Sequence, residues 1–238
     1  MTPVVGAPSS AQRLLGCVFA ASLASATVAA GAAVATALAL PETWAAATAA
    51  FGAVVGAVLS SLIGSYALSW RAAALGAASG TALGVLPQPA WDGWGPAAGC
   101  WAAAALALLV VTRERPGDVH GATSPGLVAA LHTLQLPLIL FSLAVSLVSP
   151  RPRPFVVLFA LSAFALWHLL DGECPLSRAE ARLRALRGEA APALDEIGFI
   201  GHQVHRATGI LVPEGAIARL SYTAAALTFA WYAVQALL

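Results

Sequence analysis

Four of the five histidines lie in the C-terminal part of this 238-residue chain, within residues 126–238, near other side chains that can bind metals. His168 is followed at i+3 by Asp171, so a helix would place both on one face. Neutral imidazole and carboxylate oxygen are common metal ligands, and two histidines on facing helices can also ligate haem. One hypothesis is therefore a metal or haem site near one end of the helices, with these ligands: His132, His168, Asp171, His202 and His205.

Each of these histidines also has a purely structural interpretation. His202 and His205 fall on the polar side of an amphipathic segment, where they would face lipid headgroups. His168 lies near a predicted helix end, a common position for amphipathic rings at an interface. His132 has Gln135 at i+3, so a His–Gln hydrogen bond that joins two helices accounts for this pair without a metal.

A second group of candidate residues lies just after His168, in the block Cys174-Pro175-Leu176-Ser177-x-x-Glu180. The Ser-x-x-Glu spacing predicts a capping box, with Ser177 at the start of a helix and Glu180 in its first turn. Glu180 and Arg184 form a favourable i,i+4 pair on that helix. Cys174 is interpreted as part of the chain leaving the preceding helix, and a thiol function is the alternative. The three cysteines show no Cys-x-x-Cys spacing, so neither a disulfide framework nor a zinc knuckle is indicated.

The composition indicates where these residues must be placed. Apolar residues make up 59% of the chain and charged residues only 10%, and the mean hydropathy is +0.81. A soluble domain of this size could not bury so much apolar surface, so the sequence predicts an integral membrane protein. The net charge of +1 gives no indication of a nucleic-acid partner. Because the chain has no lysine, a retinal Schiff base is excluded, and the use of arginine alone suggests a bacterial origin.

The predicted fold is an all-α polytopic helix bundle of about seven transmembrane helices. Charged residues and prolines separate the apolar segments, whose approximate bounds are 14–40, 44–68, 72–90, 96–112, 126–148, 155–170 and 216–238. Most arginines fall on one side of the membrane if the N-terminus is cytoplasmic, whereas Arg151 and Arg153 fall on the other side. The sequence thus predicts a multi-pass protein of the bacterial inner membrane with a cytoplasmic N-terminus.

Small residues recur every fourth position in the second and third segments, as Gly52, Gly56, Ser60 and Gly64, and then as Gly76, Gly80 and Gly84. This spacing lets helix backbones approach closely, which is how helices associate in lipid. The pattern indicates either tight packing within the chain or contact with a second copy or another membrane protein.

Three parts of the chain are distinguished by their composition. Residues 1–112 form an Ala/Gly-rich bundle of about four spans, 113–125 form a polar linker, and 126–238 form a C-terminal membrane unit. Within that unit, interfacial amphipathic helices are predicted at about 177–188 and 196–211, because apolar and polar residues there fall on opposite helix faces.

The C-terminal part, about 126–238, resembles an uncharacterised bacterial family of small four-helix inner-membrane proteins. The resemblance rests on Ala130-Leu131-His132, on the Cys174-Pro175-Leu176-Ser177-x-x-Glu180 block with Leu183-Arg184, and on Phe199-Ile200-x-His202. This chain departs from the family in having Ser177 where threonine is usual and His168 where glutamate is frequent. The resemblance implies a topology for this part of the chain and no activity.

No Asp, Glu or Arg lies near the middle of a predicted span, which disfavours proton-coupled transport, since such carriers need an ionisable group at that depth. Phosphate-loop, metalloprotease and serine-hydrolase motifs are also missing from the sequence. The first functional hypothesis is a non-enzymatic structural or accessory membrane component. The alternatives are a metal- or haem-dependent redox protein with its His/Asp cluster at the cytoplasmic leaflet, and a channel or carrier for a neutral or lipid-like solute.

Overall fold

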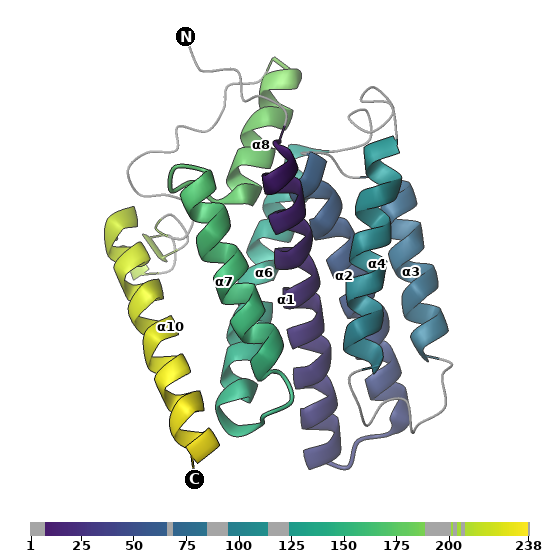
Figure 1. The fold of residues 1–238 in the computed structure, drawn as a ribbon. Coiled ribbons are helices and arrows are strands. Elements are labelled where there is room, and N and C mark those ends of the chain that lie inside the picture. The colour runs from purple at the N-terminus through teal and green to yellow at the C-terminus, as the bar shows by residue number, and fades with distance from the viewer. Residues whose placement is uncertain are drawn as a thin grey trace.

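The computed structural model describes residues 8–65, 69–84, 95–113, 124–188, 201, 204–205 and 208–237. Its helices have the following bounds: α1 Ser10–Ala37, α2 Glu42–Ser65, α3 Trp70–Gly84, α4 Gly95–Arg113, α6 Pro125–Val148, α7 Arg153–Leu169, α8 Pro175–Leu186 and α10 Glu214–Leu237. The described part of the chain contains no strand. The predicted all-α fold is therefore confirmed (Figure 1).

Three helical segments are long and apolar enough to cross a membrane: Ser10–Ala37, Ala46–Ser65 and Gly126–Val148. The segments Gly99–Val110 and Arg153–Leu169 are apolar but shorter. The long helices coincide with the seven predicted segments, but length and composition identify only these three as spans among the described residues. The structure is thus compatible with a membrane protein, and seven crossings remain a prediction.

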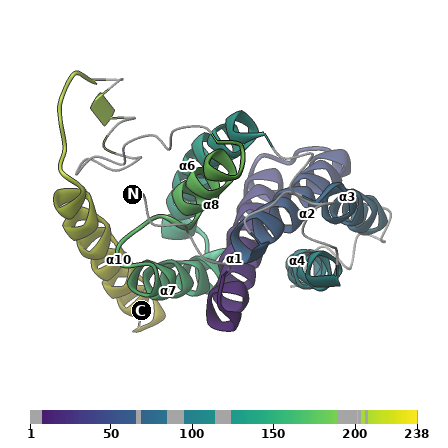
Figure 2. The ribbon, with the colours of Figure 1, turned by 90° about the horizontal axis from the view of Figure 1, so that it is seen from above.

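The helix α1 lies between two groups of helices. Seen from above in Figure 2, α2, α3 and α4 lie on one side of α1, and α6, α7, α8 and α10 lie on the other. The helix α1 packs against α2, α4, α6 and α7. The largest cluster of buried apolar residues draws on both groups, since it contains Leu23 of α1, Leu59 of α2, Leu166 of α7 and Leu183 of α8. This core therefore holds α7 and α8 against the N-terminal helices.

The described glycines of the small-residue stripes account for the close packing on the α2 side of α1. A Cβ added at Gly56 of α2 would lie 2.9 Å from the Cβ of Ala24 in α1. One added at Gly76 of α3 would lie 2.9 Å from the carbonyl oxygen of Ala53 in α2. Both distances are shorter than ordinary contacts, so at these two positions the stripe serves packing within the chain. Contact with a second copy of the chain stays a prediction.

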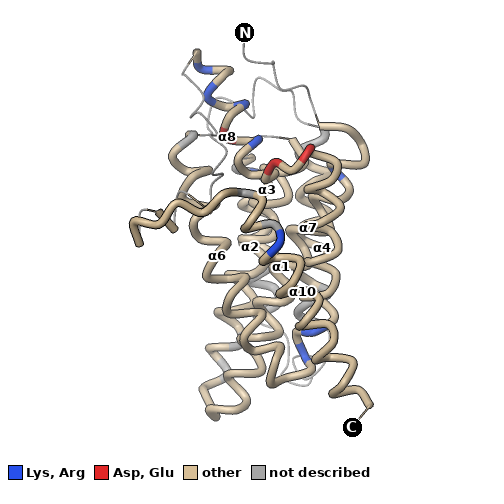
Figure 3. The backbone as a smooth tube through the Cα atoms, turned by 90° about the vertical axis from the view of Figure 1, so that its left-hand side faces the viewer, with Lys and Arg blue, Asp and Glu red and all other residues tan. Residues whose placement is uncertain are grey.

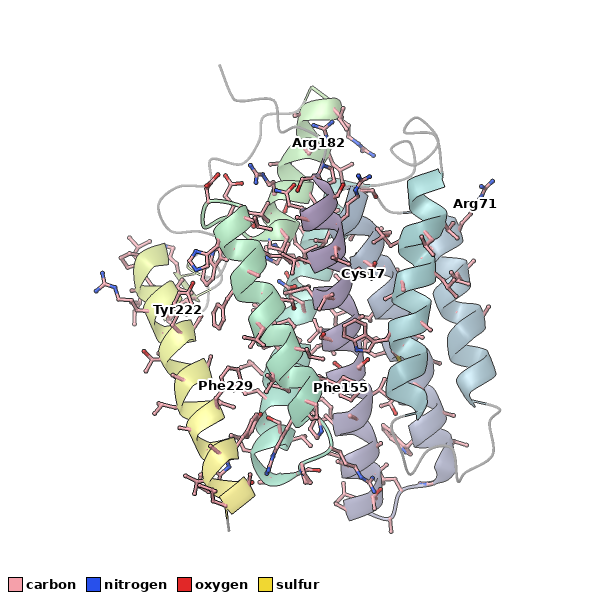
Figure 4. All side chains as sticks on the ribbon, viewed as in Figure 1. Cys17, Arg71, Phe155, Arg182, Tyr222 and Phe229 are labelled. Carbon is pink, nitrogen blue, oxygen red and sulfur yellow. The ribbon has the colours of Figure 1, made fainter. Side chains whose placement is uncertain are left out.

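Arginines occupy both ends of the bundle. In Figure 3 most of the basic segments lie around α8 and the neighbouring helix ends, and a smaller basic group lies at the opposite end. Figure 4 labels Arg71 and Arg182 at the α8 end. Arg151 and Arg153 follow α6, whose C-terminal end points away from α8. The helix α1 begins at the α8 end, and α10 ends at the opposite one (Figure 1).

Candidate ligand-binding site

His132 of α6 is almost completely buried, with 1% of its surface exposed, and its Nε2 atom lies 3.2 Å from the Cys174 Sγ atom. Gln135 stands one helical turn further along the same face of α6 and is 7% exposed. Its side chain also hydrogen-bonds to Cys174. His132 therefore contacts the thiol of a distant segment, a partner that the predicted His–Gln pair did not include.

A tight turn after α7 brings Cys174 to α6. Asp171 has φ +54° and Gly172 has φ +88°, so both occupy the left-handed region that glycine and aspartate tolerate best. The N–H group of Gly172 donates to the Trp167 carbonyl oxygen at 2.8 Å, which closes the end of α7. The chain then reverses, and Cys174 becomes the N-cap residue of α8.

The predicted capping box in α8 is wrong. The helix begins at Pro175, two residues before the predicted start, and Ser177 and Glu180 lie inside it with 8% and 9% exposure. Proline at the first helical position fixes the helical φ angle and needs no N–H partner, so it starts the helix earlier. The predicted Glu180–Arg184 pair is confirmed, at 2.8 Å between Arg184 Nη2 and Glu180 Oε1.

Glu180 also interacts electrostatically with the buried His132 ring. Two effects act on the pKa of the Cys174 thiol, and they oppose each other. Burial raises the pKa of the Cys174 thiol above its ordinary value, and hydrogen bonds from Ser177 and Gln135 act in the opposite direction. A thiol with a raised pKa stays protonated at neutral pH, so it is a weak nucleophile and a hydrogen-bonding group.

Cys174 and Gln135 form one end of a cavity of about 320 Å³ between α1, α6, α7 and α10. Its walls are mainly apolar, and they include Phe19, Leu136, Ile139, Phe159, Phe164 and Phe229. No Arg, Asp or Glu is among the described residues that line it. From Cys174 the cavity follows α6 and α7 toward Leu143 and Val156, so it is an elongated apolar space with a polar end.

At the α8 end of the cavity, α10 is attached to α7 by aromatic contacts. The Tyr222 ring stacks on Phe164 with a centroid distance of 4.4 Å and on Trp167 with 6.2 Å. Its hydroxyl lies 3.4 Å from the Nε2 atom of His168. In Figure 4 Tyr222 and Phe229 both lie on the side of α10 that faces α7.

At the opposite end, Arg153 attaches α10 to α6 and α7. Its Nε atom donates to the Ser146 carbonyl oxygen at 3.0 Å, and its Nη2 atom donates to Gln235 Oε1. The guanidinium also lies 5.2 Å from the centre of the Tyr232 ring. The indole N–H of Trp231 adds a bond to the Leu147 carbonyl oxygen at 3.0 Å. The helix α10 is therefore held at both ends, with the cavity between them.

The predicted metal ligands occupy different environments. His132 is buried against Cys174, whereas His168 is exposed beside Asp171 and Tyr222, and His205 is exposed as well. In the described ranges no group of three or more His, Cys, Asp or Glu side chains could hold a metal ion. His202 and most of the predicted interfacial helix at about 196–211 lie outside the described residues. A metal or haem site that includes His202 stays a prediction.

No pattern in the sequence predicts the cavity or the attachment of α10 directly. The unusual position of Arg151 and Arg153 was the available signal, since an arginine on the outer side of a membrane protein needs a protein partner or open solvent. The contact between His132 and Cys174 had a weaker signal in Asp171-Gly172, because such dipeptides mark a tight turn.

Comparison with known proteins adds no relative. No family model, no curated protein and no solved structure matches the chain. The resemblance of the C-terminal part to the four-helix membrane family stays an interpretation of its motifs.

Proposed function

We propose that this chain is a multi-pass membrane protein that binds one lipid-like molecule in the cavity between α1, α6, α7 and α10. The single observation that carries the proposal is the cavity itself, elongated and mainly apolar, with Gln135 and Cys174 at one end. Ligand sites generally combine apolar walls with a few polar groups that orient the ligand. A space with such walls, in a chain surrounded by lipid, suits an acyl chain.

The proposal includes the membrane topology. The α1, α2, α3, α4, α6, α7 and α10 helices cross the bilayer, with the α8 end on the cytoplasmic side and the end of α10 on the other. The larger arginine group at the α8 end supports this orientation. The bilayer is a bacterial inner membrane, as the composition suggests.

Cysteine labelling of intact cells tests this orientation. In a cysteine-free background, Ser149→Cys lies between α6 and α7, and Arg187→Cys lies after α8. A membrane-impermeant maleimide should label the first variant in intact cells and the second only after the cells are opened. Labelling of Arg187→Cys in intact cells would place the α8 end outside the cell and contradict the proposed orientation.

A non-enzymatic function agrees with the site better than catalysis does. The Cys174 thiol has a pKa raised by burial and is bonded to His132, so it is not an activated nucleophile. The cavity also carries no carboxylate or arginine among its described lining residues. Binding of a lipid-like molecule fits an accessory component that holds or passes on such a molecule.

Filling the cavity tests the proposed function. Ala160 of α7 lines the cavity, whereas the next residue, Leu161, is 55% exposed and does not line it. We expect Ala160→Phe to occupy the space that the ligand needs, and Leu161→Phe to leave it open. Each protein is purified, stripped of loosely bound lipid, and extracted for mass spectrometry of the retained lipids.

The expected result is about one retained lipid-like molecule per chain for the natural protein and for Leu161→Phe, and clear loss for Ala160→Phe. Gel filtration and circular dichroism verify that both variants are folded. Equal retention in Ala160→Phe and Leu161→Phe would contradict the proposed site.

A further inference from the structure

Thr228 of α10 carries a hydroxyl for which the described residues supply no hydrogen-bond partner. The residue is 8% exposed and lines the cavity. Gln135 Oε1 is enclosed by protein, whereas the Thr228 oxygen is not among the enclosed atoms and so keeps accessible surface. Buried hydroxyls in folded proteins usually have a partner. The Thr228 hydroxyl is therefore available to a molecule in the cavity.

Other helical threonines in the described ranges use this group within their own helix. The hydroxyls of Thr27, Thr133 and Thr223 each donate to the carbonyl oxygen four residues earlier, at 2.9, 3.0 and 2.8 Å. Thr228 makes no such bond to Ala224. A rotation about its χ1 angle would form one, because threonine has two accessible rotamers in a helix. Thr228 can thus exchange an internal acceptor for an acceptor on a ligand.

Thr228 lies at the same depth as Ser142 on the facing helix α6. The helices α6 and α10 run in the same direction, since both end away from α8 (Figure 1). The Tyr232 hydroxyl donates to the Ser146 hydroxyl. Four residues earlier in each helix, about 6 Å along the axis, are Thr228 and Ser142, which both line the cavity. The end of the cavity away from Cys174 therefore has polar groups as well.

At this end Thr228 is the hydroxyl that can donate to a ligand. The Thr27 hydroxyl has one hydrogen, which it donates to the Leu23 carbonyl oxygen. The Ser142 hydroxyl, 3.3 Å from the Thr27 oxygen, then donates its own hydrogen to that oxygen. Buried donors without an acceptor are rarer than buried acceptors without a donor. We therefore expect the group opposite Thr228 to be an acceptor.

The cavity walls limit the kind of acceptor. No arginine is among the described lining residues, so a carboxylate or phosphate would be buried without a counter-charge. A ligand hydroxyl would have to accept from Thr228 and also donate to Ser142. A neutral carbonyl oxygen needs Thr228 alone.

We propose that the ligand places an uncharged carbonyl oxygen at the end of the cavity away from Cys174, where it accepts a hydrogen bond from Thr228. The apolar chain of the ligand then runs along α6 and α7 toward Phe164. This inference rests on the proposed function and adds to it the class of polar group and the residue that recognises it.

A pair of ligands that differ only in the acceptor tests this inference. Methyl undecyl ketone and its isosteric alkene, in which a methylene group replaces the oxygen, have the same chain and nearly the same shape. Equal amounts of both are added to the full-length protein in mild detergent, and the retained ligands are measured by mass spectrometry after gel filtration. The ratio of ketone to alkene is divided by the ratio for Ala160→Phe, whose filled cavity leaves only the ligands dissolved in the detergent.

We expect the natural protein to enrich the ketone about threefold to tenfold over the alkene, the effect of one neutral hydrogen bond. Thr228→Val should abolish this enrichment, because valine has a similar shape and no hydroxyl. Thr228→Ser should retain it. The matched control is Thr223→Val in the same helix, since the Thr223 hydroxyl already donates to the Arg219 carbonyl oxygen. This control should enrich the ketone as the natural protein does.

The outcomes separate this inference from the proposed function. Equal retention of ketone and alkene by the natural protein, each above the amount in Ala160→Phe, would overturn the inference and leave the binding site intact. Enrichment that persists in Thr228→Val, or that is lost in Ser221→Ala instead, would show that Thr228 is not the donor. Stronger retention of the corresponding secondary alcohol than of the ketone would overturn the carbonyl group. If no ligand is retained above the amount in Ala160→Phe, the proposed binding site fails as well.

Discussion

Gly76 offers a sharp test of how the N-terminal helices are packed. A Cβ added at this position of α3 would lie 2.8 Å from the Cβ of Ala57, 2.9 Å from the carbonyl oxygen of Ala53 and 3.0 Å from the Cα of Val54. Two of these three atoms belong to the α2 backbone, which cannot rotate out of the way as a side chain can. Carbon atoms in contact normally lie about 3.5–4.0 Å apart. Gly76→Ala must therefore push α3 away from α2.

The size of the effect follows from two opposing contributions. Overpacking a well-packed region costs about 1–3 kcal/mol of folding free energy. Replacing glycine by alanine inside a helix returns about 1 kcal/mol or less. We expect Gly76→Ala to lower the free energy of unfolding by up to about 2 kcal/mol, which for a chain of this length is a Tm decrease of up to about 8 °C.

The matched control is Gly215→Ala in α10, where an added Cβ would meet no atom within 4 Å. This variant should melt at the Tm of the natural protein or slightly above it. Melting in mild detergent is followed with a dye that fluoresces on reaction with thiols, since Cys17 and Cys100 are 6% and 0% exposed. If Gly76→Ala melted no earlier than Gly215→Ala, α2 and α3 would not be in close contact.

Three further predictions concern the site and its supports. His132→Ala should lower the free energy of unfolding by about 2 kcal/mol or more, measured by the same melting assay, because it leaves a void and removes the bond to Cys174. Arg153→Leu should speed hydrogen exchange in α10, measured by mass spectrometry, whereas Arg151→Leu, whose side chain is bonded to Thr36 of α1, should not. The pH midpoint of Cys174 alkylation should lie above about 8.5, the pKa of a free thiol, because burial raises the pKa of this thiol; a midpoint at or below that pH would contradict this.

The positions of the helices could be predicted because apolar runs, prolines and charges divide this sequence clearly. The first predicted span, 14–40, overlaps α1, Ser10–Ala37. The helix starts earlier because Ser9 and Gln12 form a capping box, with 2.7 Å and 3.2 Å between the paired atoms. Local signals of this kind set helix ends within a few residues.

The partners of the site residues could not be predicted in the same way. His132 and Cys174 are 42 residues apart, and their contact depends on the turn at Asp171 and Gly172 and on where α8 packs. Spacing within one helix can relate His132 to Gln135, but it carries no information about a residue beyond the next helix. The cavity is less predictable still, since residues from α1, α6, α7 and α10 line it and its form depends on how these four helices pack.

The arginines that depart from the expected charge distribution have a structural explanation in those end contacts. Arg153 donates to the Ser146 carbonyl oxygen and to Gln235, and it lies over the Tyr232 ring, so it connects α6, α7 and α10. These contacts give the Arg153 guanidinium a structural role at that position. This role is independent of any effect that its charge has on the direction in which the chain inserts into the membrane. The positive-inside rule describes a bias in loops, and the larger arginine group at the α8 end can set the orientation despite this pair. Arg153, which departs from the expected charge distribution, thus attaches α10, the helix that forms one wall of the proposed ligand cavity.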